Sequence, residues 1–269
     1  MRTPISYYGG KQTMLKHILP LIPPTSHLHR GVLRRAAVLF AKRPAEAEVI
    51  NDINMELTNF YWCAQVYYSD LKREIDKTLH SRDIHAHAAH INQYPQFFLP
   101  VERAWAVWAL CKMSFASMMG GAFGYDFGGV MPKKLRNAKD DVTERLCQRL
   151  EHVTVENRNA LDVIACYDAP DAFHFVDPPY INSDCGHYDG VFSEQNMKEL
   201  LCLLETVKGK FMLTMFPYDM IEDYARKNGW IIHRVERTIS ASKTSRRKQE
   251  EWMICNYEDK KQATLFDVK

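Results

Sequence analysis

The amino-acid sequence predicts an α/β fold with a mostly parallel sheet and a helical insertion. Two blocks, residues 1–60 and 141–257, alternate short apolar runs typical of buried strands with stretches of helical periodicity. This alternation favours parallel strands with helices on the faces of the sheet. Between the blocks, residues 61–140 have helical patterning interrupted by glycine pairs typical of loops. We expect one domain formed by the two blocks, an inserted domain at 61–140 and a flexible tail at 258–269.

The first element places a glycine pair and a lysine ahead of a short helix. Apolar residues recur with helical spacing through residues 14–19, and Pro20 is expected to end this helix. Gly9 and Gly10 expose backbone N–H groups at its start, and Lys11 adds a positive charge. A carboxylate or phosphate can therefore dock at this point.

Residues 48–54 predict a strand that ends in a carboxylate. Asp52 stands at its end, which is the usual place for an acid that holds ribose hydroxyls in nucleoside-binding sheets. The alternative is that Asp52 or Asn54 only caps a helix beginning near Met55.

The most informative stretch is Asp177-Pro178-Pro179-Tyr180, which follows a short apolar strand at residues 171–176. Ligands of open α/β sheets bind at this end of the strands. The two prolines hold the chain extended and leave backbone carbonyls free to accept hydrogen bonds from an amino group. Asp177 adds an acceptor, and Tyr180 adds a face for stacking. The stretch predicts a pocket for a planar amine, although an ordinary turn at the end of a strand has a similar composition.

Further elements complete the two blocks and the insertion. After the tetrapeptide, the pattern predicts a helix at 194–207 and strands at 210–215 and 251–256. Inside the insertion, the apolar residues around 105–113 are expected to form a helical core. The histidines between residues 80 and 90 lack the spacing of metal ligands, so no metal site is expected. The aromatic residues of the following segment are expected either to pack inside or to form a wedge for stacked bases, namely Phe115, Phe123, Tyr125 and Phe127.

Composition indicates a compact protein of the cytoplasm. The chain has 269 residues, 46% of them hydrophobic, and no apolar run long enough for a transmembrane or secretory segment. Its seven cysteines include no Cys-x-x-Cys pair, which favours reduced thiols over disulfides or zinc. A net charge of +2 requires any nucleic-acid surface to be local. Two basic stretches in loop-like sequence, 133–139 and 243–248, are candidates for phosphate contacts, and a solvated charged face is their plainer interpretation.

Together, in this order and spacing, these motifs resemble the Dam-like DNA adenine methyltransferases over nearly the whole chain. The family's opening aromatic-x-Gly-Gly-Lys element matches Tyr7 to Lys11, its Asn-Asp-Ile-Asn element matches residues 51–54, and its Asp-Pro-Pro-Tyr signature matches fully. The resemblance implies a Rossmann-like sheet that binds S-adenosylmethionine, with residues 61–140 as a target-recognition domain. It also implies double-stranded DNA as the substrate and a cytoplasmic location.

The resemblance also assigns roles. Tyr7 and Lys11 are implied to contact the cofactor, and Asp52 to hold its ribose. Asn159 stands where the family has an acid beside the cofactor adenine, and an amide can still pair with that edge. The catalytic group comprises Asp177, Pro178, Pro179 and Tyr180, with Asp177 also beside the cofactor. Tyr180 is implied to stack on an adenine turned out of the duplex, while Asp177 and the Pro178 carbonyl accept hydrogen bonds from its exocyclic amine.

One segment departs from the family pattern. The family has a Glu-Pro-Phe-x-Gly-Gly-like turn for the cofactor, whereas residues 28–35 place Arg30 at the acid and Arg34 and Arg35 at the glycines. Large side chains there obstruct close approach to the cofactor. Read one nucleotide downstream with suitable codons, the segment becomes Tyr-Ile-Glu-Ala-Phe-Cys-Gly-Gly, so a pair of compensating frameshifts explains the change. If the arginines are real, the alternative is a catalytically impaired DNA-binding relic.

Two further alternatives remain open. Related Pro-Pro-Tyr motifs act on planar nitrogens in general, so RNA or a protein amide is a possible substrate class, although the insertion ahead of Asp177 favours DNA. In the tail, Gln262–Phe266 resembles the Gln-x-x-Leu-Phe peptides that bind bacterial sliding clamps. A tail packed on its own domain is an equally good interpretation. The sequence does not predict the recognised DNA site, a partner nuclease or the oligomeric state.

Overall fold

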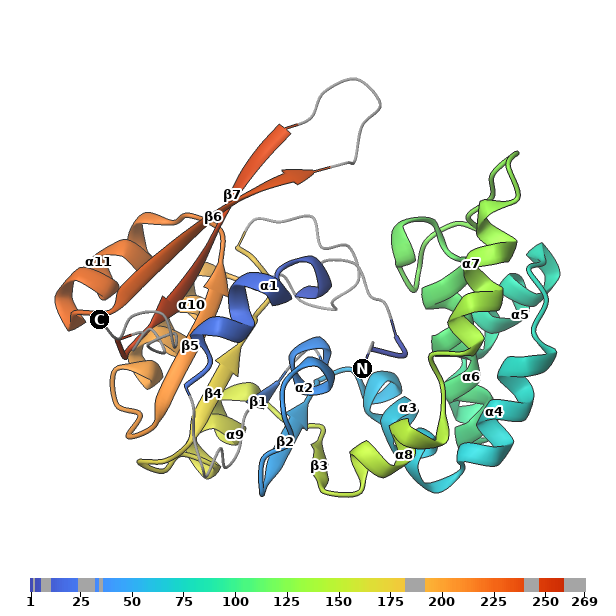
Figure 1. Ribbon diagram of the computed structural model, residues 1–269, viewed down its shortest axis with the longest axis horizontal. Coiled ribbons are helices and arrows are strands. Elements are labelled where there is room, and N and C mark those ends of the chain that lie inside the picture. The colour runs from blue at the N-terminus through green and yellow to red at the C-terminus, as the bar shows by residue number, and fades with distance from the viewer. Residues whose placement is uncertain are drawn as a thin grey trace, which may run out of the picture.

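The computed structural model describes residues 1, 3–5, 11–23, 32–33, 36–181, 192–239 and 247–258. Within them the chain is α/β, as predicted (Figure 1). In chain order, the elements are η1 (Lys11–Thr13), α1 (Leu15–Ile18), η2 (Leu19–Leu21), β1 (Val32–Leu33), α2 (Ala37–Ala41), β2 (Glu48–Asn51), α3 (Met55–Val66), α4 (Tyr68–Lys77), α5 (Arg82–Gln93), η3 (Pro95–Phe97), α6 (Pro100–Met113), η4 (Phe115–Ser117), α7 (Val130–Lys139), α8 (Glu144–Leu150), β3 (Val153–Glu156), α9 (Ala160–Cys166), β4 (Phe173–Val176), α10 (Glu194–Leu204), β5 (Lys210–Met215), α11 (Asp219–Asn228), β6 (Ile231–Ile239) and β7 (Arg247–Cys255).

The described strands form two hydrogen-bonded sheets that lie next to each other. One sheet has the order β1-β2-β3 and is parallel, and the other has the order β4-β5-β7-β6. β4 and β5 are parallel, whereas β7 runs antiparallel to both of its neighbours. β1 also contacts β4, so the two sheets meet along these strands. The mostly parallel pairing predicted from the sequence is confirmed, with β7 as the reversed strand.

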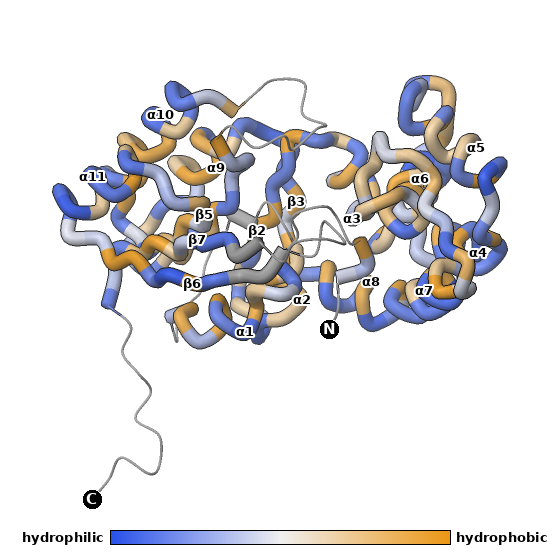
Figure 2. Tube along the Cα trace, turned by 90° about the horizontal axis from the view of Figure 1, so that it is seen from above, coloured by the Kyte–Doolittle hydropathy of each residue, from blue (hydrophilic) through white to orange (hydrophobic). Residues whose placement is uncertain are grey.

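Helices cover both faces of the second sheet, and the alternation of side chains along each strand assigns the faces. Phe175 of β4 and Met212 of β5 join the core that contains α1 and α2. Their neighbours Val176 and Leu213 join the core that contains α9, α10 and α11. Figure 2 shows the strands between these two groups of helices. Side chains of a strand alternate between the two faces of the sheet. The face on which a residue at the end of a strand lies can therefore be counted from these core residues.

The predicted elements of the second sheet are present with small shifts at their ends. β4 is buried along its whole length, and β5 occupies residues 210–215 as predicted. α10 begins at Glu194, because Ser193 and Asn196 form a capping box, and ends at Leu204 rather than at 207. Near the amino terminus, α1 has only one turn, and the chain continues past the predicted stop at Pro20 as the 3₁₀ turn η2.

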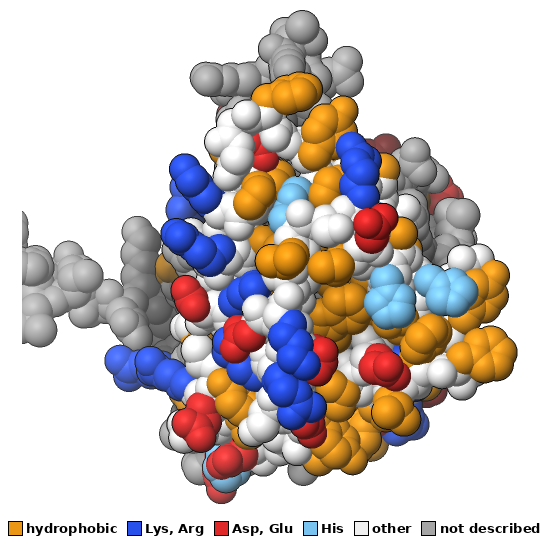
Figure 3. Space-filling model, turned by 90° about the vertical axis from the view of Figure 1, so that its right-hand side faces the viewer, with side chains coloured by type: hydrophobic (Ala, Val, Ile, Leu, Met, Phe, Trp, Pro, Cys, Tyr) orange, Lys and Arg blue, Asp and Glu red, His pale blue; other side chains and the backbone are white. Residues whose placement is uncertain are grey.

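Between β2 and β3 in the sequence, helices α3 to α7 form a helical group, on the right of Figure 1, and its buried side chains belong to the same core cluster as those of α1 and α2. Its core includes Trp108 and Met113, as the sequence predicted, while Trp105 is partly buried against it. Figure 3 shows the outer side of this group, where hydrophobic side chains are interspersed with His and with charged side chains of both signs. No helix in the described part of the chain combines the length and the hydrophobicity needed to cross a membrane.

The basic stretch 133–139 lies in helix α7, so its interpretation as a loop was wrong. Pro132 is tolerated because it lies in the first turn, where a backbone N–H has no partner within the helix. The carboxylate of Asp126 accepts hydrogen bonds from the N–H groups of Val130 and Met131, at 2.8 and 2.7 Å, and so caps the helix. Lys133, Lys134 and Arg136 are exposed on it.

Candidate active site

Three polar side chains lie on the same face at the end of the second sheet. Val176 and Leu213 face the α9 side, so the residues that follow them, Asp177 and Thr214, face the α1 side. In β7, Trp252 also faces the α9 side, which turns the preceding Glu251 to the α1 side. All three side chains are buried. The strand pattern thus brings polar groups from β5, from β7 and from the residue after β4 together on the α1 side.

Asp177 is held by partners from two other elements. Thr214 Oγ1 donates a hydrogen bond to Asp177 Oδ1 at 2.7 Å, and Lys11 Nζ lies 3.0 Å from the same oxygen. Burial of a carboxylate is costly unless it is paired and hydrogen-bonded. The lysine charge and the threonine hydroxyl therefore offset the cost of burying this carboxylate and hold it in position.

Tyr180 is the second residue of the tetrapeptide with a defined set of contacts. Its hydroxyl donates a hydrogen bond to Glu251 Oε1 at 2.7 Å and accepts one from Lys11. Its ring lies edge-on to Phe216, with the ring centroids 4.2 Å apart. Pro178 is buried, while Pro179 and Tyr180 are partly exposed. The aromatic ring therefore lies at the boundary between the buried carboxylates and the surface.

Lys11 lies inside this cluster, with only 1% of the residue exposed. Its ammonium is 2.7 Å from Glu251 Oε1 and 4.6 Å from the centroid of the Tyr180 ring. The sequence predicted an anion site at this lysine together with Gly9 and Gly10. Within the described residues, the anionic partners of Lys11 are the carboxylates of Asp177 and Glu251. The two glycines lie outside the described residues.

A second cluster lies where β2 and β3 end. The Asp52 N–H donates to the Glu156 carbonyl at 3.3 Å, and the Asp52 carboxylate accepts from the Asn54 N–H at 2.9 Å. Asn54 in turn caps α3 by accepting from the Glu56 N–H, so the predicted capping role is confirmed for Asn54. Asp52 is 8% exposed. Its carboxylate is thus oriented by the loop that precedes α3.

Amide side chains tie the loops after β2 and β3 to each other. Asn51 exchanges two hydrogen bonds of 3.0 Å with the backbone of Arg158. Asn157 Nδ2 donates to the carbonyls of Asp52 and Ile53, at 2.7 and 3.0 Å. Between these bonds the side chain of Ile53 is 67% exposed, an unusual place for a large apolar residue. The result is a rigid edge with an acid and an apolar surface side by side.

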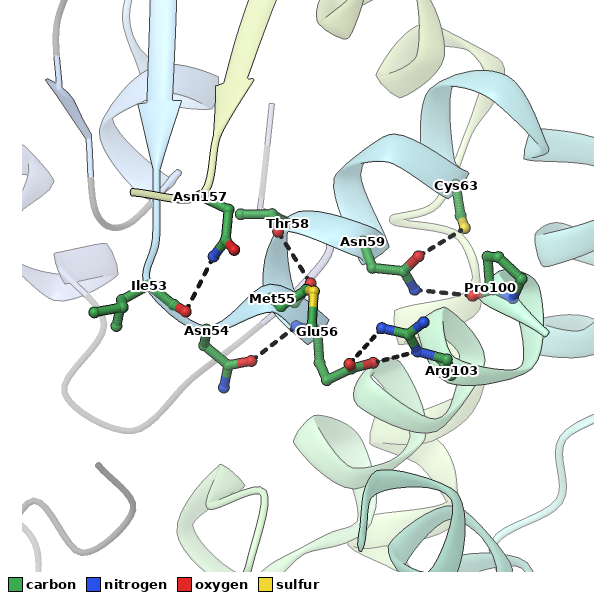
Figure 4. Close-up of polar contacts among 10 residues, drawn as sticks. All are labelled: Ile53, Asn54, Met55, Glu56, Thr58, Asn59, Cys63, Pro100, Arg103 and Asn157. Carbon is green, nitrogen blue, oxygen red and sulfur yellow. Dashed lines mark hydrogen bonds and ion pairs between the residues drawn. The ribbon is translucent and has the colours of Figure 1, made fainter. Parts of the chain in front are cut away.

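This edge is also connected to the helical group, as Figure 4 shows. Glu56, in the first turn of α3, accepts two hydrogen bonds from the Arg103 guanidinium of α6, at 2.9 and 2.5 Å. One turn later, Asn59 Nδ2 donates to the Pro100 carbonyl at 2.9 Å. Helix α3 therefore links the Asp52 loop directly to α6.

Asn159 occupies the start of α9, where it caps the helix. Its Oδ1 accepts the N–H of Leu161 at 2.9 Å, and the residue is exposed. It is the third residue after β3, whereas Asp52 follows β2 directly, and its side-chain oxygen is engaged by the helix. A role toward a ligand would use its exposed amide group.

Several predicted site residues lie outside the described residues. These are Tyr7, the arginines at 30, 34 and 35 of the altered turn, the loop at 182–191, and the tail segment Gln262–Phe266. Of the second basic stretch, residues 243–246 are also outside, and Arg247 and Lys248 form the start of β7.

The histidines of the insertion have structural contacts. His80 bonds the Gly124 carbonyl at 3.1 Å, and His85 bonds Ser114 Oγ at 2.9 Å. Burial lowers the pKa of His85. His87 and His90 pack against the ring of Phe98. Among the described residues, no group of three or more His, Cys, Asp or Glu side chains is arranged to hold a metal ion.

The aromatic residues of the insertion divide into buried and exposed ones. Phe123 packs against the helical core and against His80, with ring centroids 4.6 Å apart. Phe115, Tyr125 and Phe127 are largely exposed, and Phe127 is fully so. The expectation of buried packing therefore holds for Phe123 alone.

Sequence reasoning missed three residues of the cluster around Asp177, namely Thr214, Phe216 and Glu251. Thr214 was recognised only as part of a strand. The pairing of β4 with β5 gives the signal. Leu213 pairs with Val176, so the residues after Leu213 lie beside the tetrapeptide that follows Val176. Glu251 stands in a charged run, which gave no indication that this one carboxylate is buried.

Comparison with known families decides which family the chain belongs to. The model of the D12 class N6 adenine-specific DNA methyltransferase family matches residues 7–239. The chain belongs to this family. The resemblance inferred from the motifs is therefore confirmed, and the protein is an adenine-specific DNA methyltransferase whose substrate is DNA. The match spans the altered turn at 28–35 and gives no preference to a catalytically impaired relic.

Comparisons with individual proteins add little to this assignment. No curated protein matches the chain. A solved structure of precorrin-8W decarboxylase from Methanobacterium thermoautotrophicum is similar at 10% identity and a TM-score of 0.40, covering 96% of both chains. Precorrin-6Y C5,15-methyltransferase from Geobacter metallireducens GS-15 is similar at 14% identity and a TM-score of 0.26, covering 58% of this chain and 74% of that chain. At such scores, neither structure indicates the function of this methyltransferase.

Proposed function

We propose that this methyltransferase transfers a methyl group from S-adenosylmethionine to the N6 amine of an adenine turned out of double-stranded DNA, and that Asp177-Pro178-Pro179-Tyr180 is its catalytic pocket. The observation that carries the proposal is the buried Asp177 carboxylate at the end of β4, flanked by the Tyr180 ring. An adenine amine is planar and carries two N–H donors. A fixed carboxylate, a proline carbonyl and an aromatic ring provide acceptors and a stacking surface for it.

The residues of the sheet edge fit the proposed cofactor. β1 lies between β2 and β4, so in a Rossmann-like sheet the strand order reverses there, which is where nucleotides bind. Asp52 offers a fixed carboxylate to the ribose hydroxyls, and the exposed Ile53 side chain offers an apolar surface to the adenine ring. Asn159 and Tyr7 are proposed as further contacts. When bound, the cofactor supplies a methyl group activated by its sulfonium charge.

The catalytic work assigned to the protein is positioning and electrostatic. Asp177 and the Pro178 carbonyl accept hydrogen bonds from the adenine amine, which directs the nitrogen lone pair toward the methyl group. As the nitrogen becomes positive, the adjacent carboxylate stabilises it. Turning a base out of the duplex costs roughly a few kcal/mol of free energy. Stacking of Tyr180 on the adenine offsets part of this cost. Lys11 is the counter-ion of Asp177 in the absence of substrate.

Recognition of the DNA is assigned to the inserted helical group, residues 61–140, while residues 1–60 and 141–257 form the catalytic and cofactor-binding domain. Two features support this division. The exposed aromatic rings of Phe115, Tyr125 and Phe127 provide surfaces that stack on bases. The exposed lysines at the start of α7 provide positive charge for phosphates.

Methylation of unmodified double-stranded DNA with labelled S-adenosylmethionine tests the proposal. We expect label in N6-methyladenine within a defined sequence, and much less label in RNA of the same sequence. Label found only in RNA or protein would reject the DNA assignment.

Calorimetric titration with S-adenosylmethionine addresses the altered turn at 28–35, since DNA binding without cofactor binding would identify an impaired relic. The proposed clamp contact of the tail is tested separately, by deleting residues 262–269 and measuring co-purification with the sliding clamp.

A further inference from the structure

Glu251 reaches the active site because β7 continues past the end of β5. Met215, the last residue of β5, pairs with Trp252, so Glu251 lies one position beyond the paired part of the two strands. There it faces the α1 side of the sheet, and its side chain is completely buried. Because β7 is the antiparallel strand, a residue from its first half reaches the edge where the parallel strands end.

The carboxylate of Glu251 contacts both the Lys11 ammonium and the Tyr180 hydroxyl beside Asp177. Its Oε1 lies 2.7 Å from Lys11 Nζ and accepts the Tyr180 hydroxyl at 2.7 Å. Lys11 Nζ lies at the same time 3.0 Å from Asp177 Oδ1. One ammonium is therefore shared between two carboxylates.

The sharing of Lys11 matters for a reaction in which positive charge develops beside Asp177. If Lys11 had Asp177 as its sole counter-ion, the pair would be neutral, and the carboxylate would stabilise the developing charge less. Lys11 would also compete with the adenine amine for Asp177 Oδ1. With Glu251 present, Lys11 can withdraw from Asp177 and still keep a counter-ion in the buried site.

We propose that Glu251 is a positioning residue that retains Lys11 and Tyr180, so that Asp177 is available to the adenine amine. This inference rests on the proposed function of the site. It assigns Glu251 an electrostatic role in methyl transfer, in addition to its place in the buried core.

Single-turnover methylation by the full-length enzyme, at saturating DNA and S-adenosylmethionine, tests the inference. Glu251→Gln keeps the shape and the acceptor oxygen but removes the charge, so we expect the rate to fall at least about tenfold, as for other preorganised charge-stabilising groups. The dissociation constants for DNA and for the cofactor should change less than about threefold, since Glu251 is assigned no contact with either. Glu251→Asp restores the charge and should recover part of the rate.

Glu250→Gln is the matched control. Glu250 adjoins Glu251 in β7 but faces the other side of the sheet, where it accepts a hydrogen bond from Trp252 Nε1 at 2.6 Å. Its rate should stay near that of the wild type. An unchanged rate in Glu251→Gln, equal rates in Glu251→Gln and Glu251→Asp, or a loss confined to DNA or cofactor affinity would each overturn the inference. Failure of Glu251→Gln to fold would assign Glu251 a structural role instead. Inactivity of the wild type would reject the proposed function itself.

Discussion

Thr214 donates a hydrogen bond from Oγ1 to Oδ1 of Asp177 at 2.7 Å, and both residues are buried. The bond joins the carboxyl ends of two adjacent parallel strands, since Val176 and Leu213 pair immediately before these residues. A hydroxyl that points at one carboxylate oxygen fixes the rotation of the whole group. The orientation of Asp177 is therefore set by β5 as well as by its own strand.

Replacing Thr214 by Val tests this orientation. The variant keeps the branched shape but loses the donor, and a hydrogen bond to a charged group contributes about 1.5–3 kcal/mol. If about half of that contribution is needed in the transition state, the single-turnover rate falls roughly tenfold. Thr214→Ser retains the hydroxyl and serves as the control. Equal rates in the Val and Ser variants would show that the bond has no part in transfer.

Replacing Asp177 by Ala or Asn should abolish methyl transfer while leaving the fold nearly intact. Asn keeps the shape but not the charge that stabilises the developing positive nitrogen, so we expect a loss of at least about 100-fold. Folding is expected to survive because Lys11 keeps Glu251 as its counter-ion, 2.7 Å away. Transfer is measured by incorporation of labelled methyl groups, and folding by thermal unfolding. Full activity in either variant would remove Asp177 from the mechanism.

The core of the site was predictable from the sequence because its signals are local. The Asp177 tetrapeptide follows a short apolar strand, and Asp52 follows another, so each position could be read from a few neighbouring residues. Lys11 was assigned to the site region only through the resemblance to a family. Its contact with Asp177 depends on how α1 packs on the sheet, and the sequence does not encode that packing locally.

Glu251 was beyond sequence reasoning for a physical reason. The second half of β7 is buried on both faces, so Trp252 to Cys255 show no alternation that would tell which of Glu250 and Glu251 points inward. The register with β5 is needed to decide. Helix α7 was interpreted as a loop because the usual sequence signal for a helix start is missing. Its cap is the carboxylate of Asp126, four residues before the helix begins.

The ion pair between Glu56 and Arg103 predicts a coupling between the Asp52 loop, which is proposed to hold the cofactor, and the helical group. The pair is bidentate, and its side chains are 12% and 19% exposed. Arg103→Met should lower the free energy of unfolding by about 1–2 kcal/mol, between the values for exposed and buried pairs. It should also reduce the effect of bound cofactor on DNA affinity, because Glu56 lies in the first turn of α3, directly after the Asp52 loop.

The measurements for this coupling are urea unfolding and DNA titrations with and without S-adenosylmethionine. The exposed pair Glu74 and Lys77 on α4 offers a control, since Lys77→Met should change stability by less than about 0.5 kcal/mol. If Arg103→Met leaves the cofactor effect on DNA affinity unchanged, α3 does not couple the two regions.

His174 predicts a dependence of stability on pH. The residue is fully buried in β4, and burial lowers its pKa from the ordinary value of 6.5, although Asp168 opposes this shift. The unfolded chain then binds more protons than the folded one below pH 6.5. The contribution of His174 to stability is therefore complete above pH 6.5 and is lost as pH falls toward the lowered pKa. His85, whose pKa is also lowered by burial, adds to the same trend.

Urea unfolding at a series of pH values checks this dependence. His174→Gln should show a smaller loss of unfolding free energy than the wild type as the buffer is acidified below pH 6.5. The exposed His152 is the control, and His152→Gln should keep the wild-type slope. Identical slopes in His174→Gln and the wild type would show that His174 does not protonate on unfolding.

Asp126 predicts a link between the order of α7 and DNA binding. Its carboxylate accepts the N–H groups of Gly128, Val130 and Met131, at 2.8, 2.8 and 2.7 Å, and these bonds lower its pKa. The stabilising effect is thus present at neutral pH and is lost as pH falls through the lowered pKa. Because Asp126 lies between the exposed rings of Tyr125 and Phe127, its cap also fixes the backbone that presents them.

Asp126→Ala should therefore speed hydrogen exchange at the Val130 and Met131 amides and weaken binding to double-stranded DNA. The single-turnover rate at saturating DNA should remain unchanged, because Asp126 belongs to the helical group and has no contact with the Asp177 cluster. Asp140→Ala, at the other end of α7, removes an exposed carboxylate that accepts no such bonds among the described contacts and serves as the control. Wild-type DNA affinity in Asp126→Ala, despite faster exchange at the two amides, would show that the ordered start of α7 is not part of the DNA-binding surface.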